Sequence, residues 1–146
     1  MGKPELGLVG EITQVNLDPI NQALGSSAIP VIAPIGEGEN EILNINADIA
    51  SVELVKAMNP DKVIFLSETG GIFNQSNKLI ETINLVLEYE DLMQQDWLHS
   101  GMKLKLEQVK ALLDHLPKTS SVSITQPINL PKELFTDSGS GTLVKH

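Results

Sequence analysis

Short apolar runs alternate with amphipathic segments along this chain. Residues 62–66 end in four consecutive apolar side chains, which predicts a parallel strand covered on both faces. A β-branched run between prolines predicts a second buried strand over residues 28–34. The glycines and acidic residues of 35–40 indicate a loop or hairpin tip, from which residues 41–45 return as a strand. Residues 121–125 alternate as in a strand with one buried face.

Helices are expected between these strands. Asn46 can cap a helix over residues 47–58, which Asn59-Pro60 ends because a residue before proline avoids the helical region. Ser100 can cap a longer helix over residues 101–116. The remaining expected elements are a helix at 88–95, a helix at 130–135, a hairpin around the polar turn 74–77, a loop at 137–141 and a strand at 142–144. This alternation predicts an α/β fold, with a mainly parallel sheet and helices on both sides.

Composition narrows the classes of function. The chain has 146 residues, enough for one domain, and its formal charge is −9. All ten basic residues are lysines. The chain is acidic and has no basic stretch, so nucleic acids and anionic membranes are not expected partners. The longest apolar run, 29–35, is too short to span a membrane. Cysteine is absent, which excludes disulfides and thiolate chemistry, and the three histidines lie too far apart in sequence to predict a metal site.

Ligands of such sheets bind beyond the carboxyl ends of the strands. This rule selects Ser67, Glu68, Gly70 and Gly71, which follow the most apolar strand. The two glycines allow a ligand to approach the backbone closely, but a hairpin entry also favours Gly-Gly, and the sequence matches no known phosphate-loop motif.

The rule also selects Asn44, Asn46 and Asp48, where a strand runs into a helix. Helix amides suit a carboxylate or phosphate, and an amide at Asn44 can orient it. The alternative is structural, with Asn46 as a simple cap and Asp48 as an acid that the helix dipole favours.

A third candidate is the start of the helix at residues 100–105. Lys103 and Lys105 oppose the helix dipole there, so their placement is a hint of an anion site. Solvated lysines on a polar helix face are the alternative explanation.

Taken together, several blocks resemble the N-acetylglutamate kinases of the amino acid kinase family. The blocks are Val9-Gly10-Glu11, Ile29-Pro30-Val31-Ile32-Ala33-Pro34-Ile35-Gly36, Asn44-Ile45-Asn46-Ala47-Asp48, Lys62 to Leu66, Gly70-Gly71-Ile72, Gly101-Met102-Lys103-Leu104-Lys105 and Glu133 to Thr142. The stretch from Glu88 to Trp97 is most similar to fungal mitochondrial members, and also to the kinase-like domain of N-acetylglutamate synthases.

This resemblance implies a three-layer αβα sandwich that transfers a phosphoryl group from ATP, with Mg²⁺, to the side-chain carboxylate of N-acetylglutamate in arginine biosynthesis. It implies that Asn44 binds substrate and that Asp48 and Lys105 are catalytic. The implied nucleotide-binding residues are Ser67, Glu68, Gly70, Gly71, Ser100, Gly101 and Met102. The implied residues of an arginine-effector pocket are Glu133, Thr136, Gly139 and Gly141.

Two departures from the family pattern qualify these expectations. Glu68 stands where kinases usually have aspartate, and the N-terminal half of the family domain is missing. Residues 1–146 are therefore expected to form a partial kinase domain, namely its C-terminal, ATP-binding portion. This portion is expected to be inactive alone. The alternative is a non-catalytic, arginine-sensing or oligomerisation domain of an N-acetylglutamate synthase. The resemblance also implies a homo-oligomer that associates with that synthase, in the mitochondrial matrix if fungal and otherwise in the cytoplasm.

Overall fold

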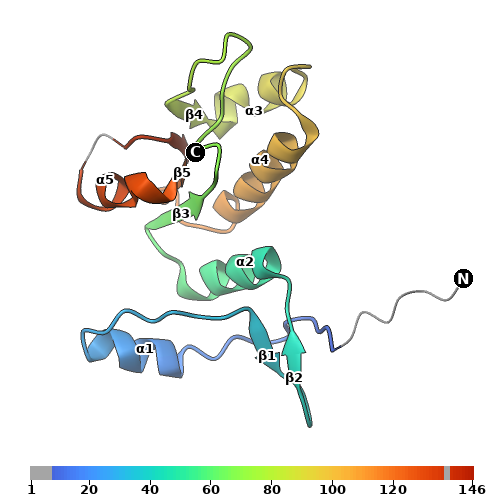
Figure 1. Ribbon diagram of the computed structural model, residues 1–146, viewed down its shortest axis with the longest axis vertical. Coiled ribbons are helices and arrows are strands. Elements are labelled where there is room, and N and C mark those ends of the chain that lie inside the picture. Colours follow the sequence, from blue (N-terminus) through green and yellow to red (C-terminus); the bar gives the residue numbers. More distant parts are fainter. Residues whose placement is uncertain (1–7, 137–138) are drawn as a thin grey trace, which may run out of the picture. The chain divides into compact units, whose positions relative to one another are not determined.

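The computed structural model describes residues 8–136 and 139–146, and the chain divides into two compact units (Figure 1). The first unit ends at Met58 and the second begins at Asn59. Asp137 and Ser138 of the predicted loop 137–141 lie outside the described residues. No helix in the described ranges is long and apolar enough to cross a membrane.

The first unit contains a hairpin and two helices. Strands β1 (Ile35–Glu37) and β2 (Ile42–Asn44) pair antiparallel, and Val9 bridges Asn44 in parallel. Helix α1 (Asp18–Gly25) was not predicted, whereas α2 (Ala47–Met58) has the predicted bounds. The predicted cap of α2 is confirmed, because Asn46 Oδ1 accepts hydrogen bonds from the amides of residues 48 and 49 at 3.0 and 3.2 Å.

The predicted strand at residues 28–34 is wrong in this structure. The segment has no strand pairing among the described residues, and Ile29 and Val31 are 90% and 95% exposed. The strand starts only at Ile35, so β1 occupies part of the predicted loop. A strand is stable only with neighbours that complete its backbone hydrogen bonds, and here the apolar run has none.

The second unit is built on a mixed four-stranded sheet in the order β3-β5-β6-β4 (Figure 1). The strands are β3 (Lys62–Leu66), β4 (Thr82–Asn84), β5 (Ser121–Thr125) and β6 (Thr142–Lys145). The β3–β5 and β4–β6 pairs are parallel and only β5–β6 is antiparallel, so the mainly parallel sheet is confirmed. All of β4 was missed, because three residues directly before a helix carry little pattern.

Helices cover both faces of this sheet, which gives the predicted three layers (Figure 1). Helix α4 (Ser100–Leu113) and helix α5 (Leu130–Phe135) each contact β5, and α3 (Leu85–Met93) contacts β4. A short 3₁₀ helix, η1 (Pro127–Asn129), precedes α5. The core gathers the buried faces of α4 and the strands, with Leu106, Val109 and Ile124 fully buried.

Three local expectations in this unit need correction. His99, not Ser100, is the cap of α4, since its Nδ1 accepts from the Met102 amide at 3.3 Å. Helix α3 starts at Leu85 because Asn84 caps it, three residues before the predicted start. Strand β5 is buried on both faces from residue 122 onward, because it lies inside the sheet between two helical layers. The predicted hairpin is confirmed by the Phe73–Leu79 bridge.

Candidate functional site

In the first unit, Asn44 and Asp48 flank the turn from β2 into α2. The backbone of Asn44 is held on both sides, since its amide donates to Leu8 at 2.7 Å and its carbonyl accepts from Gly10 at 3.1 Å. The side chains of Asn44 and Asp48 are exposed. A fixed backbone with two exposed polar side chains beside a helix start can receive an anionic group. The structural alternative also fits, because Asn46 caps α2 and Asp48 lies in its first turn, where the helix dipole favours an acid.

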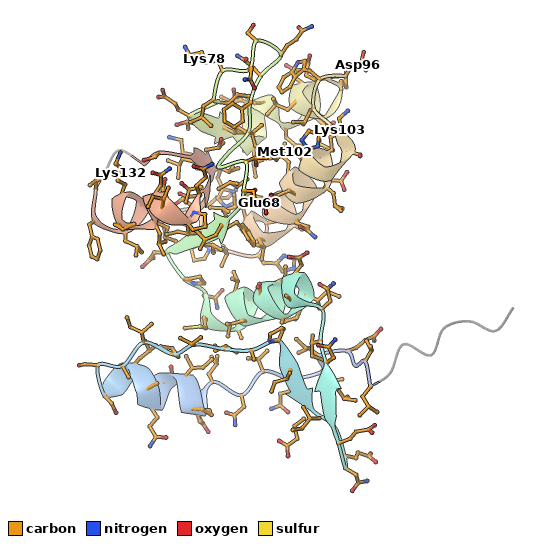
Figure 2. All side chains as sticks on the ribbon, viewed as in Figure 1. Glu68, Lys78, Asp96, Met102, Lys103 and Lys132 are labelled. Atoms are coloured by element: carbon orange, nitrogen blue, oxygen red, sulfur yellow. The ribbon has the colours of Figure 1, made fainter. Side chains whose placement is uncertain are left out.

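In the second unit, the predicted Ser67–Gly71 loop lies at the carboxyl ends of β3 and β5. Leu66 pairs with Thr125, and the Ser67 amide donates to the Thr125 carbonyl at 2.8 Å. The Ser67 and Thr69 hydroxyls are 3.0 Å apart, and the exposed side chain of Glu68 is labelled in Figure 2. The loop therefore presents two hydroxyls and a carboxylate where sheets of this kind bind ligands.

The two glycines of this loop are explained by contacts within the protein. Gly70 has a φ of +74°, and a Cβ there would lie 2.6 Å from the Gln126 side chain, which donates to the Glu68 carbonyl at 2.9 Å. A Cβ at Gly71 would lie 2.9 Å from the hydroxyl of Thr142. That hydroxyl accepts from the Ile72 amide at 2.8 Å, so the glycines let the loop close on β5 and β6.

The start of α4 offers backbone amides and two lysines. Ser100 and Gly101 are exposed, and their amides have no acceptor among the described residues. Met102 points into the core and is 7% exposed, and its amide already donates to His99, so it has no free donor for a ligand at this end. Lys103 and Lys105 are half-buried and pair with no described carboxylate. Unpaired ammonium groups beside a helix start attract anions.

The predicted effector residues lie around the buried carboxylate of Glu133, which is 4% exposed. Its Oε1 accepts from the Ser140 amide at 2.9 Å, and its Oε2 lies 3.6 Å from Lys62 Nζ. The same ammonium donates to the Glu133 carbonyl at 2.6 Å. A side chain at Gly139 would collide with the carboxylate, and one at Gly141 would collide with the backbone of β5. The contacts of Glu133 therefore link helix α5 to strand β3 and to the residues that lead into β6.

The remaining effector prediction, Thr136, lies at the end of α5. Its hydroxyl donates to the Lys132 carbonyl at 2.7 Å, and Lys132 is labelled on α5 in Figure 2. Thr136 thus closes the helix, while Glu133 holds the loop that follows it.

The structure adds residues that the sequence did not reveal. Lys62 is the first residue of the apolar strand β3. The sequence does not mark it as a functional residue, because its partner Glu133 is 71 positions away. Gln126 follows the carboxyl end of β5, so the rule that selected Ser67 could have selected it too. The buried hydroxyls of Ser123 and Thr125 have no hydrogen-bond partner among the described residues. In the described part of the chain, no cluster of three acidic or histidine side chains could hold a metal ion.

At the C-terminal end of α4, contacts with neighbouring groups shift the pKa values of several side chains. A hydrogen bond of 2.7 Å from Lys110 lowers the pKa of Asp114 and raises the pKa of Lys110. Burial raises the pKa of Tyr89, over whose ring Lys110 lies at 5.6 Å. This group ties α3 to the last turns of α4.

A comparison with models of protein families identifies the family of the chain. Residues 2–122 match the model of the amino acid kinase family. The chain belongs to the amino acid kinase family. This membership confirms the resemblance in the sequence, while the roles of individual residues stay predictions.

Relatives of the chain include bacterial and fungal proteins. The chain is 59% identical over 140 residues to an acetylglutamate kinase of Xylella fastidiosa (strain 9a5c), covering 95% of this chain and 33% of that protein. It is 47% identical over 146 residues to the mitochondrial protein arg-6 of Neurospora crassa, covering 99% of this chain and 17% of that protein. The chain thus spans a third or less of the length of these relatives.

A solved structure confirms the fold. The N-acetylglutamate synthase from Neisseria gonorrhoeae, complexed with coenzyme A and L-arginine, matches with a TM-score of 0.78 and 20% sequence identity. The match covers 94% of this chain and 32% of that chain. At this identity the match supports the amino acid kinase fold alone.

Proposed function

We propose that this chain is the C-terminal, nucleotide-binding part of an acetylglutamate kinase domain, spanning residues 1–146. The complete domain transfers the γ-phosphoryl group of ATP to the side-chain carboxylate of N-acetylglutamate, a step of arginine biosynthesis. The identity of 59% with a protein named acetylglutamate kinase, over 95% of this chain, is the observation that carries the proposal. The chain alone is inactive, because the rest of the domain supplies the other half of the site.

In this proposal the first unit binds the acceptor substrate. Asn44 holds the α-carboxylate of N-acetylglutamate, for which its exposed amide on a fixed backbone is suited. Asp48 accepts hydrogen bonds through its carboxylate and orients the ammonium groups of the catalytic lysines. Because phosphoryl transfer depends on positioning and on positive charge around the transferred group, these two side chains act without covalent chemistry.

The second unit binds ATP, which carries its own Mg²⁺. The loop residues Ser67, Glu68, Gly70 and Gly71 and the helix start at Ser100, Gly101 and Met102 line the nucleotide pocket. The amides of Ser100 and Gly101, which have no acceptor in the described part of the chain, supply donors for phosphate oxygens. Lys105 stabilises the negative charge that develops on the phosphoryl group during transfer, a role for which an unpaired ammonium is suited.

Regulation and assembly complete the proposal. Arginine inhibits the domain by binding at Glu133, Thr136, Gly139 and Gly141. The domain forms homo-oligomers and associates with N-acetylglutamate synthase. It acts in the mitochondrial matrix in a fungal cell and in the cytoplasm in a bacterium.

A chimera tests the proposal. The chain replaces the 140 aligned residues of the Xylella fastidiosa kinase, and ADP release is measured with ATP, Mg²⁺ and N-acetylglutamate. We expect turnover by the chimera and none by the 146-residue chain. In the chimera, Lys105→Ala lowers kcat by about 100-fold or more, whereas the matched Lys103→Ala variant keeps most of the rate.

Two results would contradict the proposal. A folded chimera that binds arginine but transfers no phosphoryl group supports the non-catalytic synthase-like domain instead. Equal losses from the Lys103 and Lys105 substitutions would remove the assigned role of Lys105.

A further inference from the structure

The loop of residues 67–71 is tied to the end of strand β5 by two hydrogen bonds. The Ser67 amide donates to the Thr125 carbonyl at 2.8 Å, which fixes the start of the loop. The Gln126 side chain donates through Nε2 to the Glu68 carbonyl at 2.9 Å, which fixes its middle. Among the described residues, Gln126 is the only one outside the loop whose side chain makes a hydrogen bond to it.

The backbone of Gln126 has little freedom. It follows Thr125, which pairs with Leu66 in the sheet, and it precedes Pro127, which restricts the residue before it to extended conformations. Its φ and ψ are −83° and 151°, and its carbonyl accepts from the Asn129 amide at 2.9 Å where η1 begins. The end of β5 therefore directs the Gln126 side chain to one place.

The stem of the Gln126 side chain packs against Gly70. A Cβ at Gly70 would lie 2.6 Å from Gln126 Cγ and 3.1 Å from its Cδ, so the stem occupies the space beside the glycine. The φ of Gly70 is +74°, and its amide donates to the Ser67 carbonyl at 3.2 Å, which closes a turn over residues 67–70. Gln126 thus contacts this turn twice, at Gly70 and at the Glu68 carbonyl.

The Glu68 carbonyl belongs to the central peptide group of this turn. Rotation of the central peptide group converts one type of turn into another and changes where the neighbouring side chains point. Here those side chains are the exposed Glu68 carboxylate and the Ser67 and Thr69 hydroxyls, which lie 3.0 Å apart. The hydrogen bond from Gln126 holds the peptide group, and therefore these three polar groups, in one orientation.

We propose that Gln126 is a positioning residue for the nucleotide, because its amide holds the turn of residues 67–70 in the shape that receives MgATP. The inference rests on the proposed function, which assigns this loop to the nucleotide pocket. A loop that is already ordered loses less conformational entropy when it binds its ligand. Gln126 acts through the loop and touches no reacting atom, so its loss weakens nucleotide binding and leaves the transfer step intact.

Hydrogen exchange in the 146-residue chain tests the effect on the loop. Gln126→Met keeps a stem of similar length but has no donor, and we expect the Gly70 amide to exchange about three- to tenfold faster. Gln126→Glu keeps the shape, but its carboxylate cannot donate, so it should have the same effect. The Ser67 amide keeps its wild-type rate in both variants, because its acceptor is the Thr125 carbonyl.

Nucleotide binding is measured in the chimera with the Xylella fastidiosa kinase. We expect both variants to raise the Kd for MgATP, determined by calorimetry, and the KM for MgATP by about three- to tenfold. The values of kcat and of KM for N-acetylglutamate stay within about twofold of the wild type, because only nucleotide binding is weakened. Gln108→Met is the matched control. It removes the same amide group from a half-buried position in the middle of α4 and is expected to change none of these values.

Several results would overturn the positioning role. These are an unchanged exchange rate at Gly70 in both variants, an unchanged Kd for MgATP, and a fall in kcat without a rise in the KM for MgATP. Wild-type behaviour of Gln126→Glu would also overturn it, since packing on Gly70 would then suffice without the donor.

The outcomes also separate this inference from the proposed function. An inactive chimera whose MgATP binding is still weakened by Gln126→Met supports the positioning role and contradicts the proposed phosphoryl transfer. An active chimera in which both variants keep the wild-type KM for MgATP supports the transfer and contradicts the positioning role. A folded chimera that binds no MgATP contradicts both.

Discussion

Glu133 connects helix α5 to the loop before β6, and its removal is expected to destabilise the second unit. With the described residues, its buried carboxylate makes two interactions of unequal strength. The hydrogen bond from the Ser140 amide, at 2.9 Å, goes to a charged acceptor and contributes about 1.5–3 kcal/mol. The ion pair with Lys62 is longer, at 3.6 Å, and the Lys62 side chain is 37% exposed, so solvent screening holds its contribution below about 1 kcal/mol.

The hydrogen bond from the Ser140 amide therefore contributes more than the ion pair with Lys62. The loss of unfolding free energy in each variant should follow this order. Glu133→Ala removes both interactions and is expected to cost about 2–4 kcal/mol. Glu133→Gln keeps an oxygen for the Ser140 amide but loses the charge, which costs about 1–2 kcal/mol. Lys62→Met removes the ion pair and the hydrogen bond to the Glu133 carbonyl, and it is expected to cost less than Glu133→Ala because the buried carboxylate keeps its hydrogen bond from the Ser140 amide. Glu107→Gln, at an exposed position of α4, is the matched control with no expected change.

Urea unfolding followed by tryptophan fluorescence measures this ranking. The single tryptophan, Trp97, packs against the core of the second unit and reports on that unit. With a slope of about 1–3 kcal/mol per molar urea, Glu133→Gln should lower the midpoint by roughly 0.3–2 M. A larger loss from Lys62→Met than from Glu133→Ala would show that the contacts of Lys62 outweigh the Ser140 hydrogen bond and would refute this reasoning.

Three further predictions concern helices α2 and α4. Leu106→Ala empties a fully buried position and should cost about 2–4 kcal/mol in the same urea titration, whereas Leu104→Ala, at a 56% exposed site, should be nearly neutral. Asn46→Ala removes the cap of α2, which should cost about 1 kcal/mol and speed hydrogen exchange in its first turn; unchanged exchange would contradict the cap role. Asp114 has a pKa below 3.8 because of Lys110, so its charge stabilises the fold above that pH, and the advantage over Asp114→Asn should vanish as the pH falls through the lowered value. An advantage that persists in stronger acid would exclude this linkage.

Local patterns predicted some elements well. Helix α2 has its predicted bounds because Asn46 provides the cap and Asn59-Pro60 the stop within the segment itself. Strand β3 has its predicted bounds because a dense apolar run is decisive by itself. Helix α1 also has a local start signal, the pair Asp18-Pro19 in its first turn, although no helix was predicted there.

Other features depend on residues far away in the sequence. The run at residues 28–34 has the composition of a strand but lacks a neighbour for its free edge. The ion pair of Lys62 and Glu133 forms because β3 and α5 lie next to each other in the folded chain, and no local sequence pattern encodes this proximity. The glycines of the loop after β3 were explained by ligand approach, yet Gln126 and Thr142 account for them once β5 and β6 are placed.

The two prolines at positions 30 and 34 also limit how this chain can aggregate. Fibril growth needs strands that pair on both edges, so that each added copy offers a new template to the next. The edge of residues 29, 31 and 33 has three amide donors, whereas on the opposite edge only Ile32 has one, so a strand adds to the first edge more readily than to the second. The exposed apolar run is therefore poorly suited to repeated stacking into a fibril.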